Sequence, residues 1–236
     1  MWRTSNRGVI LGLFLILILI IYVFVDKITF NNEKVLIKET ITKYMDDYSS
    51  YISNTEEFCN SSGTWNDSLL KEKKEHITKI LNDYWTDTFY TDTLNPWGQH
   101  SKSDMLNLVK ELYDTSHYSI KTGYTRPIQY NISEMKITKN GPNGAKVSFD
   151  LRCKIIYQGT QYSVFFDGQI MSPNDYTYSN NDSDSLTEKT VILDTSPTFN
   201  LLRENGKWKL SDAQSYGYGI SVQETATQPD KIEEVK

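Results

Sequence analysis

Residues 199–213 read FNLLRENGKWKLSDA. Two runs that contain bulky apolar residues, one from Phe199 to Arg203 and one through Trp208 and Leu210, flank the dipeptide Asn205-Gly206. Asn-Gly between such runs is the strongest short-range signal for a β-hairpin, because both residues tolerate the positive φ angles of a tight turn. The segment therefore predicts two antiparallel strands near the end of the folded part.

The sequence just upstream of this hairpin predicts a long central strand. Apolar residues occupy every other position from Ala145 to Tyr157, with Cys153 on the inward-facing series. A second alternating segment at 162–170 follows Gln158-Gly159 and should pair antiparallel with the first. A further short strand is expected around 191–193.

An irregularity is expected in the strand that precedes residue 140. Residues 128–132 and 135–137 alternate on opposite parities, which predicts a β-bulge near Ser133 and Glu134. The period of two begins after His117. The second half of the chain should therefore form an antiparallel sheet.

Before His117 the apolar period is about 3.6, which predicts three amphipathic helices. The first carries the buried stripe Val35, Ile37, Ile41, Tyr44, Met45, Tyr48, Tyr51 and Ile52. The second, after the caps Asn66 and Asp67, carries Leu70, Ile77, Ile80, Leu81, Tyr84, Trp85 and Phe89. The third begins at the capping-box pair Ser101 and Asp104 and buries Met105, Leu108, Val109 and Leu112. Helices followed by strands predict an α+β domain whose helices cover one face of a curved antiparallel sheet.

Residues 9–25, VILGLFLILILIIYVFV, contain no charged side chain and predict one transmembrane helix. Arg3 and Arg7 precede the run, so the positive-inside rule predicts a cytoplasmic N-terminus at 1–8. Residues 26–220 then form an extracytoplasmic domain of a single-pass cell-membrane protein, and 221–236 form a disordered tail. A secretory signal peptide is the alternative. The run exceeds a typical apolar h-region and no small-x-small cleavage site follows it, which favours an uncleaved anchor.

The charge of the exported part argues against nucleic-acid binding. Beyond Arg3 and Arg7 the chain holds 23 basic and 30 acidic residues, a net charge of −7. Such a surface repels phosphate backbones. The basic run Lys71–Lys74 is short and contains Glu72, as on a solvated helix face.

Two cysteines, Cys59 and Cys153, lie in the exported part, where a disulfide persists if it forms. Their number permits one bridge. The alternative is that Cys153 sits in the core as a small apolar side chain.

The order of elements and the hairpin resemble the nuclear-transport-factor-2-like superfamily over roughly residues 33 to 220. The matching hairpin positions are Phe199, Leu201, Arg203, Gly206, Trp208 and Leu210. With the preceding span, the layout resembles the bitopic inner-membrane scaffold subunit of type IV secretion and conjugation machines. That resemblance implies a protein that is not an enzyme, has no cofactor, is anchored in the lipid bilayer, and binds other envelope or secretion-channel proteins or further copies of itself.

The sequence offers little chemistry of its own, and we expect no catalytic, cofactor or metal residues. The three histidines, His76, His100 and His117, lie in separate elements, and Glu72 with His76 reads as a solvated pair rather than a metal site. The loop 180–188 carries alternating Asp182 and Asp184 but lacks the glycine of an EF-hand. An acid–base role for His117 with a sheet tyrosine is the remaining catalytic alternative.

Four tyrosines in polar or glycine-containing segments are candidates for an exposed contact surface: Tyr176, Tyr178, Tyr216 and Tyr218. Large amphipathic rings are enriched at recognition surfaces, although the same rings also anchor loops. The preferred hypothesis is that the protein is an assembly subunit of a bacterial conjugative or type IV secretion apparatus. The alternative is a membrane-tethered extracytoplasmic domain that binds a small ligand or cell-wall fragment in a cavity.

Overall fold

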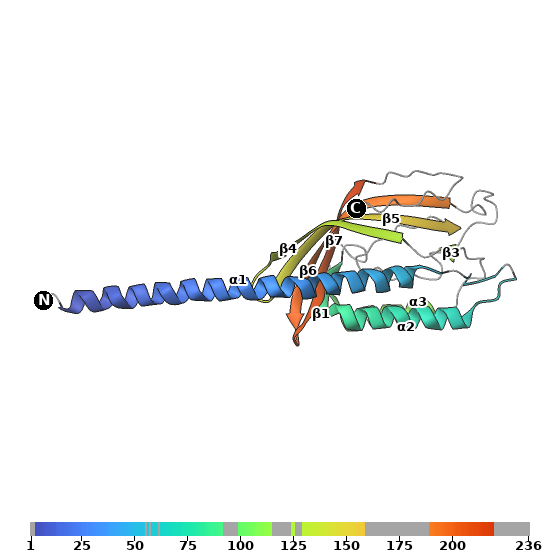
Figure 1. Ribbon diagram of the computed structural model, residues 1–236. Coiled ribbons are helices and arrows are strands. Elements are labelled where there is room, and N and C mark those ends of the chain that lie inside the picture. Colours follow the sequence, from blue (N-terminus) through green and yellow to red (C-terminus); the bar gives the residue numbers. More distant parts are fainter. Residues whose placement is uncertain are drawn as a thin grey trace. The chain divides into compact units, whose positions relative to one another are not determined.

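The computed structural model describes residues 3–54, 56, 58–60, 62–91, 99–114, 124–125, 129–158 and 189–219 (Figure 1). The chain divides into two compact units, Met1–Ile41 and Thr42–Lys236. Helix α1 (Arg3–Ile52) contributes to both. The two units are considered in turn.

The first unit is the N-terminal part of α1, and its most prominent feature is exposed apolar surface. Large apolar side chains from Val9 to Val25 are 47–68% exposed. One described helix is therefore long and apolar enough to cross a membrane, although a signal sequence near an N-terminus has the same properties. The helix continues without a break past Asp26, and Val35, predicted to be buried, is 62% exposed.

The second unit is α+β, as predicted, and contains a mixed sheet. Its described strands are β1 (Trp85–Thr91), β2 (Gln99–Ser101), β3 (Tyr124–Thr125), β4 (Gln129–Lys139), β5 (Gly144–Gln158), β6 (Lys189–Glu204) and β7 (Lys207–Gly219). They lie in the order β2-β1-β7-β6-β5-β3, and β4 also pairs with β5. The described strand pairs are antiparallel, as expected, except that β1 pairs parallel with β7.

The local irregularities of the sheet lie where the sequence places them. Asn205 (φ 50°) and Gly206 (φ 79°) form the turn between β6 and β7. The register of β4 against β5 shifts between Ser133 and Lys136, and Glu134 has a φ of 52°, which confirms the predicted bulge. The segments expected around 191–193 and at 199–203 form one continuous strand, β6. The strand predicted at 162–170 and the tail 221–236 lie outside the described residues.

Helices α2 (Asp67–Tyr84) and α3 (Lys102–Asp114) lie side by side and pack against β1 (Figure 1). Both begin at the predicted caps. Asn66 Oδ1 accepts a hydrogen bond from Leu69 N (3.1 Å), and Ser101 Oγ accepts one from Asp104 N (3.1 Å). Met105 and Val109 of α3 are buried as expected, whereas Leu108 and Leu112 are half-buried.

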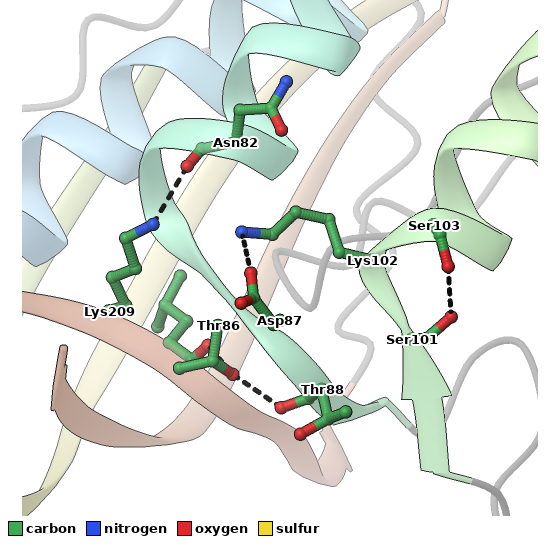
Figure 2. Close-up of polar contacts among 9 residues, drawn as sticks. Asn82, Thr86, Asp87, Thr88, Ser101, Lys102, Ser103 and Lys209 are labelled. Carbon is green, nitrogen blue, oxygen red and sulfur yellow. Dashed lines mark hydrogen bonds and ion pairs between the residues drawn. The ribbon is translucent and has the colours of Figure 1, made fainter.

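The end of α2 corrects one prediction, because Trp85 and Phe89 lie on β1 rather than on the helix. The segment Trp85–Thr91 consists of β-branched and aromatic residues apart from one aspartate, a composition that favours strand. Polar contacts hold the chain at this transition. Lys209 Nζ donates to Asn82 O in the last turn of α2 (3.1 Å), as Figure 2 shows. Thr86 Oγ1 donates to Leu210 O on β7 (3.2 Å). The side chains of Trp85 and Phe89 are nevertheless fully buried, as the apolar pattern required.

The core of the second unit is built from aromatic rings around Tyr44 of α1. The Tyr44 ring lies edge-on to those of Trp85 (6.1 Å between centroids, 78°) and Phe199 (5.9 Å, 77°). Phe199 in turn stacks on Phe149 of β5 at 5.8 Å. These contacts join helix, β1, β5 and β6. Among the described residues, rings therefore fill the space between α1 and the sheet.

We expect Phe199→Ala to lower the free energy of unfolding by about 3–5 kcal/mol, because it removes a buried ring from the centre of this cluster. Urea denaturation measures the change. Leu202→Ala is the matched control: Leu202 lies on the same strand but is 43% exposed, so its truncation should cost about 1 kcal/mol or less. Equal losses for the two variants would contradict the proposed core.

Candidate functional site

A polar pocket of about 570 Å³ lies within the second unit, at the C-terminal end of α1. The end of α1 and the segment after it form one side, the first turns of α2 form the other, and one residue comes from β4. Its lining residues are Asp46, Ser49, Ser50, Ser53, Asn54, Glu56, Asn66, Ser68, Leu69, Glu72, Lys73 and Tyr130. All but Leu69 carry a polar side chain.

Lys73 of α2 holds the last turn of α1. Its side chain is buried, and Nζ donates hydrogen bonds to three backbone carbonyl oxygens, those of Ser50 (3.1 Å), Tyr51 (2.8 Å) and Ser53. The last carbonyl groups of a helix have no hydrogen-bond donor within the helix and carry its negative partial charge. An ammonium group at this position donates hydrogen bonds to these carbonyls and offsets the charge. An ammonium group has three N–H donors, and all three are used.

The burial of Lys73 has an electrostatic cost. Removal from water disfavours the charged form and lowers the pKa of Lys73 from 10.5 to about 8, while the nearby carboxylate of Glu72 acts in the opposite direction. At neutral pH the residue is still mostly protonated. Its charge is directed at the backbone of α1.

Asp46 and Tyr130 tie α1 to β4 at the edge of the pocket. Tyr130 Oη donates a hydrogen bond to Asp46 Oδ1. Burial, together with this bond to a carboxylate, raises the pKa of the Tyr130 hydroxyl well above its ordinary value of 10. The phenol therefore stays a donor at physiological pH. At the next residue of α1, Asp47 accepts a hydrogen bond from Tyr84 Oη (2.7 Å), which ties α1 to the end of α2.

Asn66 organises the segment that connects α1 to α2. Besides capping α2, it donates from Nδ2 to Glu56 Oε2 (2.9 Å), and its backbone N–H donates to Phe58 O (2.8 Å). The buried side chain of Asn54 donates to Glu56 O (2.9 Å). These bonds hold the Glu56 carboxylate at the rim of the pocket.

Ser49 is the exception to this pattern of satisfied groups. Its side chain is only 6% exposed, and its Oγ has no hydrogen-bond partner among the described residues. A buried hydroxyl without a partner costs about 1–3 kcal/mol. The indole N–H of Trp85 shares this condition but lies in the aromatic core, whereas Ser49 lines the pocket.

The charges that line the pocket are mostly negative. Three carboxylates, Asp46, Glu56 and Glu72, oppose the single ammonium of Lys73. The arrangement can accept hydrogen bonds and stabilise positive charge. Lys73 donates its hydrogen bonds to backbone carbonyl oxygens, and among the described contacts none joins it to Ser49.

The predicted contact surface of tyrosines is largely outside the part of the chain that the structure describes. Tyr176 and Tyr178 lie in 159–188, which is not described. Tyr216 and Tyr218 belong by their backbone to β7, but their side chains are not described. The contact surface therefore stays a prediction.

The two cysteines are both described, both are buried, and no disulfide joins them. Cys153 lies on the inward face of β5, as the alternation predicted. Burial raises the pKa of its thiol to about 12, which keeps it protonated and unreactive. The backbone of Cys59 pairs antiparallel with that of Trp65 in the segment between α1 and α2, which is distant in sequence from β5. The disulfide that the cysteine count permitted is thus not formed in the structure.

The described residues hold no cluster of three or more His, Cys, Asp or Glu side chains suited to a metal ion. His76 lies on α2 beside Tyr51, with 6.1 Å between ring centroids, and its pKa is lowered mainly by burial. His117 and the acidic loop 180–188 lie outside the described residues, so neither the acid–base alternative nor the calcium alternative is tested.

A scan of protein-family models found no match to this chain, and a search of curated proteins found none either. Solved structures similar to it are proteins of the nuclear-transport-factor-2-like superfamily. One is a superfamily protein from Salmonella enterica, 12% identical with a TM-score of 0.35, whose match covers 80% of this chain and 95% of that one. A second, described as a scytalone dehydratase of Novosphingobium aromaticivorans, is 11% identical with a TM-score of 0.36, covering 85% and 99% of the two chains.

A third similar structure is a hexachlorocyclohexane dehydrochlorinase, 8% identical with a TM-score of 0.39, covering 80% of this chain and 90% of that one. The sequence-based expectation that the chain is not an enzyme is corrected by these neighbours. Two of the three are named as enzymes, a dehydrochlorinase and a dehydratase.

The spacing of Lys73 in the sequence is a signal for the pocket. Lys73 belongs to the run assigned to a solvated helix face, yet it follows Leu70 by three residues and precedes Ile77 by four. That spacing places it on the buried stripe of α2, where the structure finds it. A lysine on a buried stripe needs acceptors, and the end of α1 supplies them.

The pH dependence of stability tests the burial of Lys73. Below pH 8 the residue is protonated in the folded and unfolded states, and between about 8 and 10.5 only the unfolded state keeps the proton. The unfolded state then binds more protons, so the free energy of unfolding should rise with pH across this window by about 3 kcal/mol. Urea denaturation of wild type and Lys73→Met at a series of pH values isolates this contribution, because other groups cancel in the difference.

Lys71→Met is the control, since Lys71 lies on the same helix with 77% of its side chain exposed. It should retain the rise seen in the wild type, and Lys73→Met should lose it. Parallel curves for wild type and Lys73→Met would show that the ammonium group is not buried.

Proposed function

We propose that this chain is a membrane-anchored binding protein whose folded domain takes a small polar ligand in the pocket at the end of α1. The observation that carries the proposal is the buried Ser49 hydroxyl, which lines the pocket and has no partner among the described residues. Buried polar groups in folded proteins are generally hydrogen-bonded, and at Ser49, unlike at Trp85, the adjoining pocket gives another molecule access to complete that bonding. The pocket volume of about 570 Å³ lies within the range of small-molecule sites, roughly 300–1,000 Å³.

The lining favours a hydroxylated ligand over an apolar one. Eleven of the twelve lining residues carry a polar side chain, and Leu69 is the exception. Small-molecule pockets that bind drug-like compounds are mainly apolar, so this site suits a ligand that is itself rich in hydrogen-bonding groups. A saccharide or another fragment of the cell wall has this character and is of suitable size.

The apolar part of α1 supports a location at the membrane. Residues 9–25 are long enough to span most of the hydrocarbon core, and Arg3 and Arg7 on the N-terminal side favour a cytoplasmic start. In this arrangement the binding domain lies outside the cytoplasm, where cell-wall fragments occur. The more specific role in a conjugative or type IV secretion apparatus stays a prediction, because nothing in the described part of the chain bears on it.

The anchor is tested by following the fate of the N-terminus. We expect the full-length protein to stay in membranes washed with alkaline carbonate, with residues 1–25 intact by mass spectrometry, and its domain to be digested by protease added outside spheroplasts. The double substitution Ile28→Ala and Phe30→Ala places a small-x-small signal after the apolar run and should release the domain by signal cleavage. Recovery of the wild type as a soluble, shortened chain would identify a signal peptide instead.

The role of Ser49 is tested by a pair of serine substitutions on neighbouring turns. Ser49→Ala removes a buried hydroxyl without a partner and should raise the free energy of unfolding by about 1 kcal/mol. Ser53→Ala removes a hydroxyl that donates to Ser49 O (2.7 Å) and should lower it by about 1 kcal/mol. The Ser49→Ala variant should also bind saccharide fragments more weakly than the wild type in calorimetric titrations. A loss of stability in both variants would mean that the Ser49 hydroxyl is already satisfied.

A further inference from the structure

We infer that the ligand of this pocket carries a primary or secondary ammonium group together with hydroxyl groups, as amino sugars do; this inference rests on the proposed binding function. The charges around the pocket carry the argument. Three carboxylates face one ammonium, and the position of that ammonium decides what a ligand encounters.

Lys73 does not offer its charge to a ligand as a donor. Its three N–H groups are all donated to the carbonyl oxygens of Ser50, Tyr51 and Ser53. An anionic ligand would therefore have to displace bonds that terminate α1. The ammonium offsets the negative end of the helix and leaves the carboxylates to set the field in the pocket.

Each of the three carboxylates keeps acceptor capacity. Asp46 accepts from Tyr130 through Oδ1, and Glu56 accepts from Asn66 through Oε2, so each has a second oxygen that accepts no hydrogen bond from another described residue. Glu72 forms no hydrogen bond with a described residue. Ammonium N–H groups are the donors that carboxylates bind most strongly, through charge-assisted hydrogen bonds.

The other lining groups narrow the class of cation. Among the described lining residues Tyr130 is the only aromatic one, so these residues do not form the aromatic cage that recognises quaternary ammonium. The described carboxylates do not converge into a cluster suited to a metal ion. The buried Ser49 hydroxyl and the exposed hydroxyls of Ser50 and Ser68 match a ligand that also carries hydroxyl groups.

The test compares two ligands that differ only at nitrogen. The β-1,4-linked disaccharide of glucosamine and its di-N-acetylated counterpart are titrated calorimetrically into the full-length protein in phosphatidylcholine nanodiscs, since anionic lipids would themselves bind the amine. We expect the free amine to bind at least about tenfold more tightly, a difference of about 1.4 kcal/mol. The preference should shrink when the salt concentration is raised, because exposed carboxylates are screened.

The variants Glu72→Gln and Glu75→Gln distinguish an effect of the pocket carboxylates on binding from an effect of the net charge of the protein. Both remove one negative charge from α2, but Glu75 lies outside the pocket lining with 69% of its side chain exposed. Glu72→Gln should reduce the preference for the amine to about threefold or less, and Glu75→Gln should leave it unchanged. Conservation of the fold is verified by circular dichroism.

The outcomes distinguish this inference from the proposed function. If the acetylated disaccharide binds as tightly as the amine, and Ser49→Ala weakens both, the inference of a cationic ligand is overturned and the polar binding site stands. If the amine is preferred but Glu72→Gln and Glu75→Gln act alike, the preference arises from overall charge and the inference is again overturned. If neither disaccharide binds at concentrations up to about 10 mM, the binding free energy of each is weaker than about −3 kcal/mol. In that case both proposals fail.

Discussion

The last turn of α1 has to end inside a folded domain, and Lys73 is what makes that ending stable. Carbonyl groups at a helix terminus need donors, and burial of the terminus removes water as the donor. A single ammonium group from α2 supplies three hydrogen bonds at once. The same bonds fix the spacing between α1 and α2, and the connecting segment, held by Asn54 and Asn66, closes the space between them. The pocket is a consequence of how this helix end is satisfied.

The aromatic core explains why the pocket lies at the end of α1 instead of between helix and sheet. Tyr44 brings Trp85, Tyr84 and Phe199 into edge contacts within about 6 Å, and such aromatic pairs contribute about 0.5–1.5 kcal/mol beyond the area that they bury. Rings of this size leave little room for a ligand between α1 and the described strands. On α1 the pocket is lined by Asp46, Ser49 and Ser50, whereas the rings of Tyr44, Tyr48 and Tyr51, at other positions around the helix, are buried. The division between core and site therefore follows the two faces of one helix.

The sequence predicts most local structure because most of it depends on short-range chemistry. The Asn205-Gly206 turn, the bulge at Glu134 and the caps Asn66 and Ser101 each follow from the preferences of a few adjacent residues, and the structure confirms them. The predictions fail where the structure depends on contacts between segments that are distant in sequence. Trp85 continues the apolar period of α2, but its pairing with Leu210 in β7 draws the chain into a strand. The pocket could not be predicted from residues alone, because Asp46, Glu56, Glu72 and Tyr130 meet only through the tertiary packing of α1, α2 and β4.

Several unfavourable features converge on one small region of this domain. A lysine is buried at a cost that lowers its pKa, a serine hydroxyl is buried without a partner, and three carboxylates lie around the same space. Each could be relieved by a single substitution, and a buried polar group without a partner calls for a physical explanation. Lys73 is explained by the helix end that it satisfies. Asp46 and Glu56 each accept one hydrogen bond, from Tyr130 and from Asn66, whereas the Ser49 hydroxyl has no partner among the described residues. A ligand with hydroxyl and ammonium donors would satisfy Ser49 and the remaining carboxylate oxygens together.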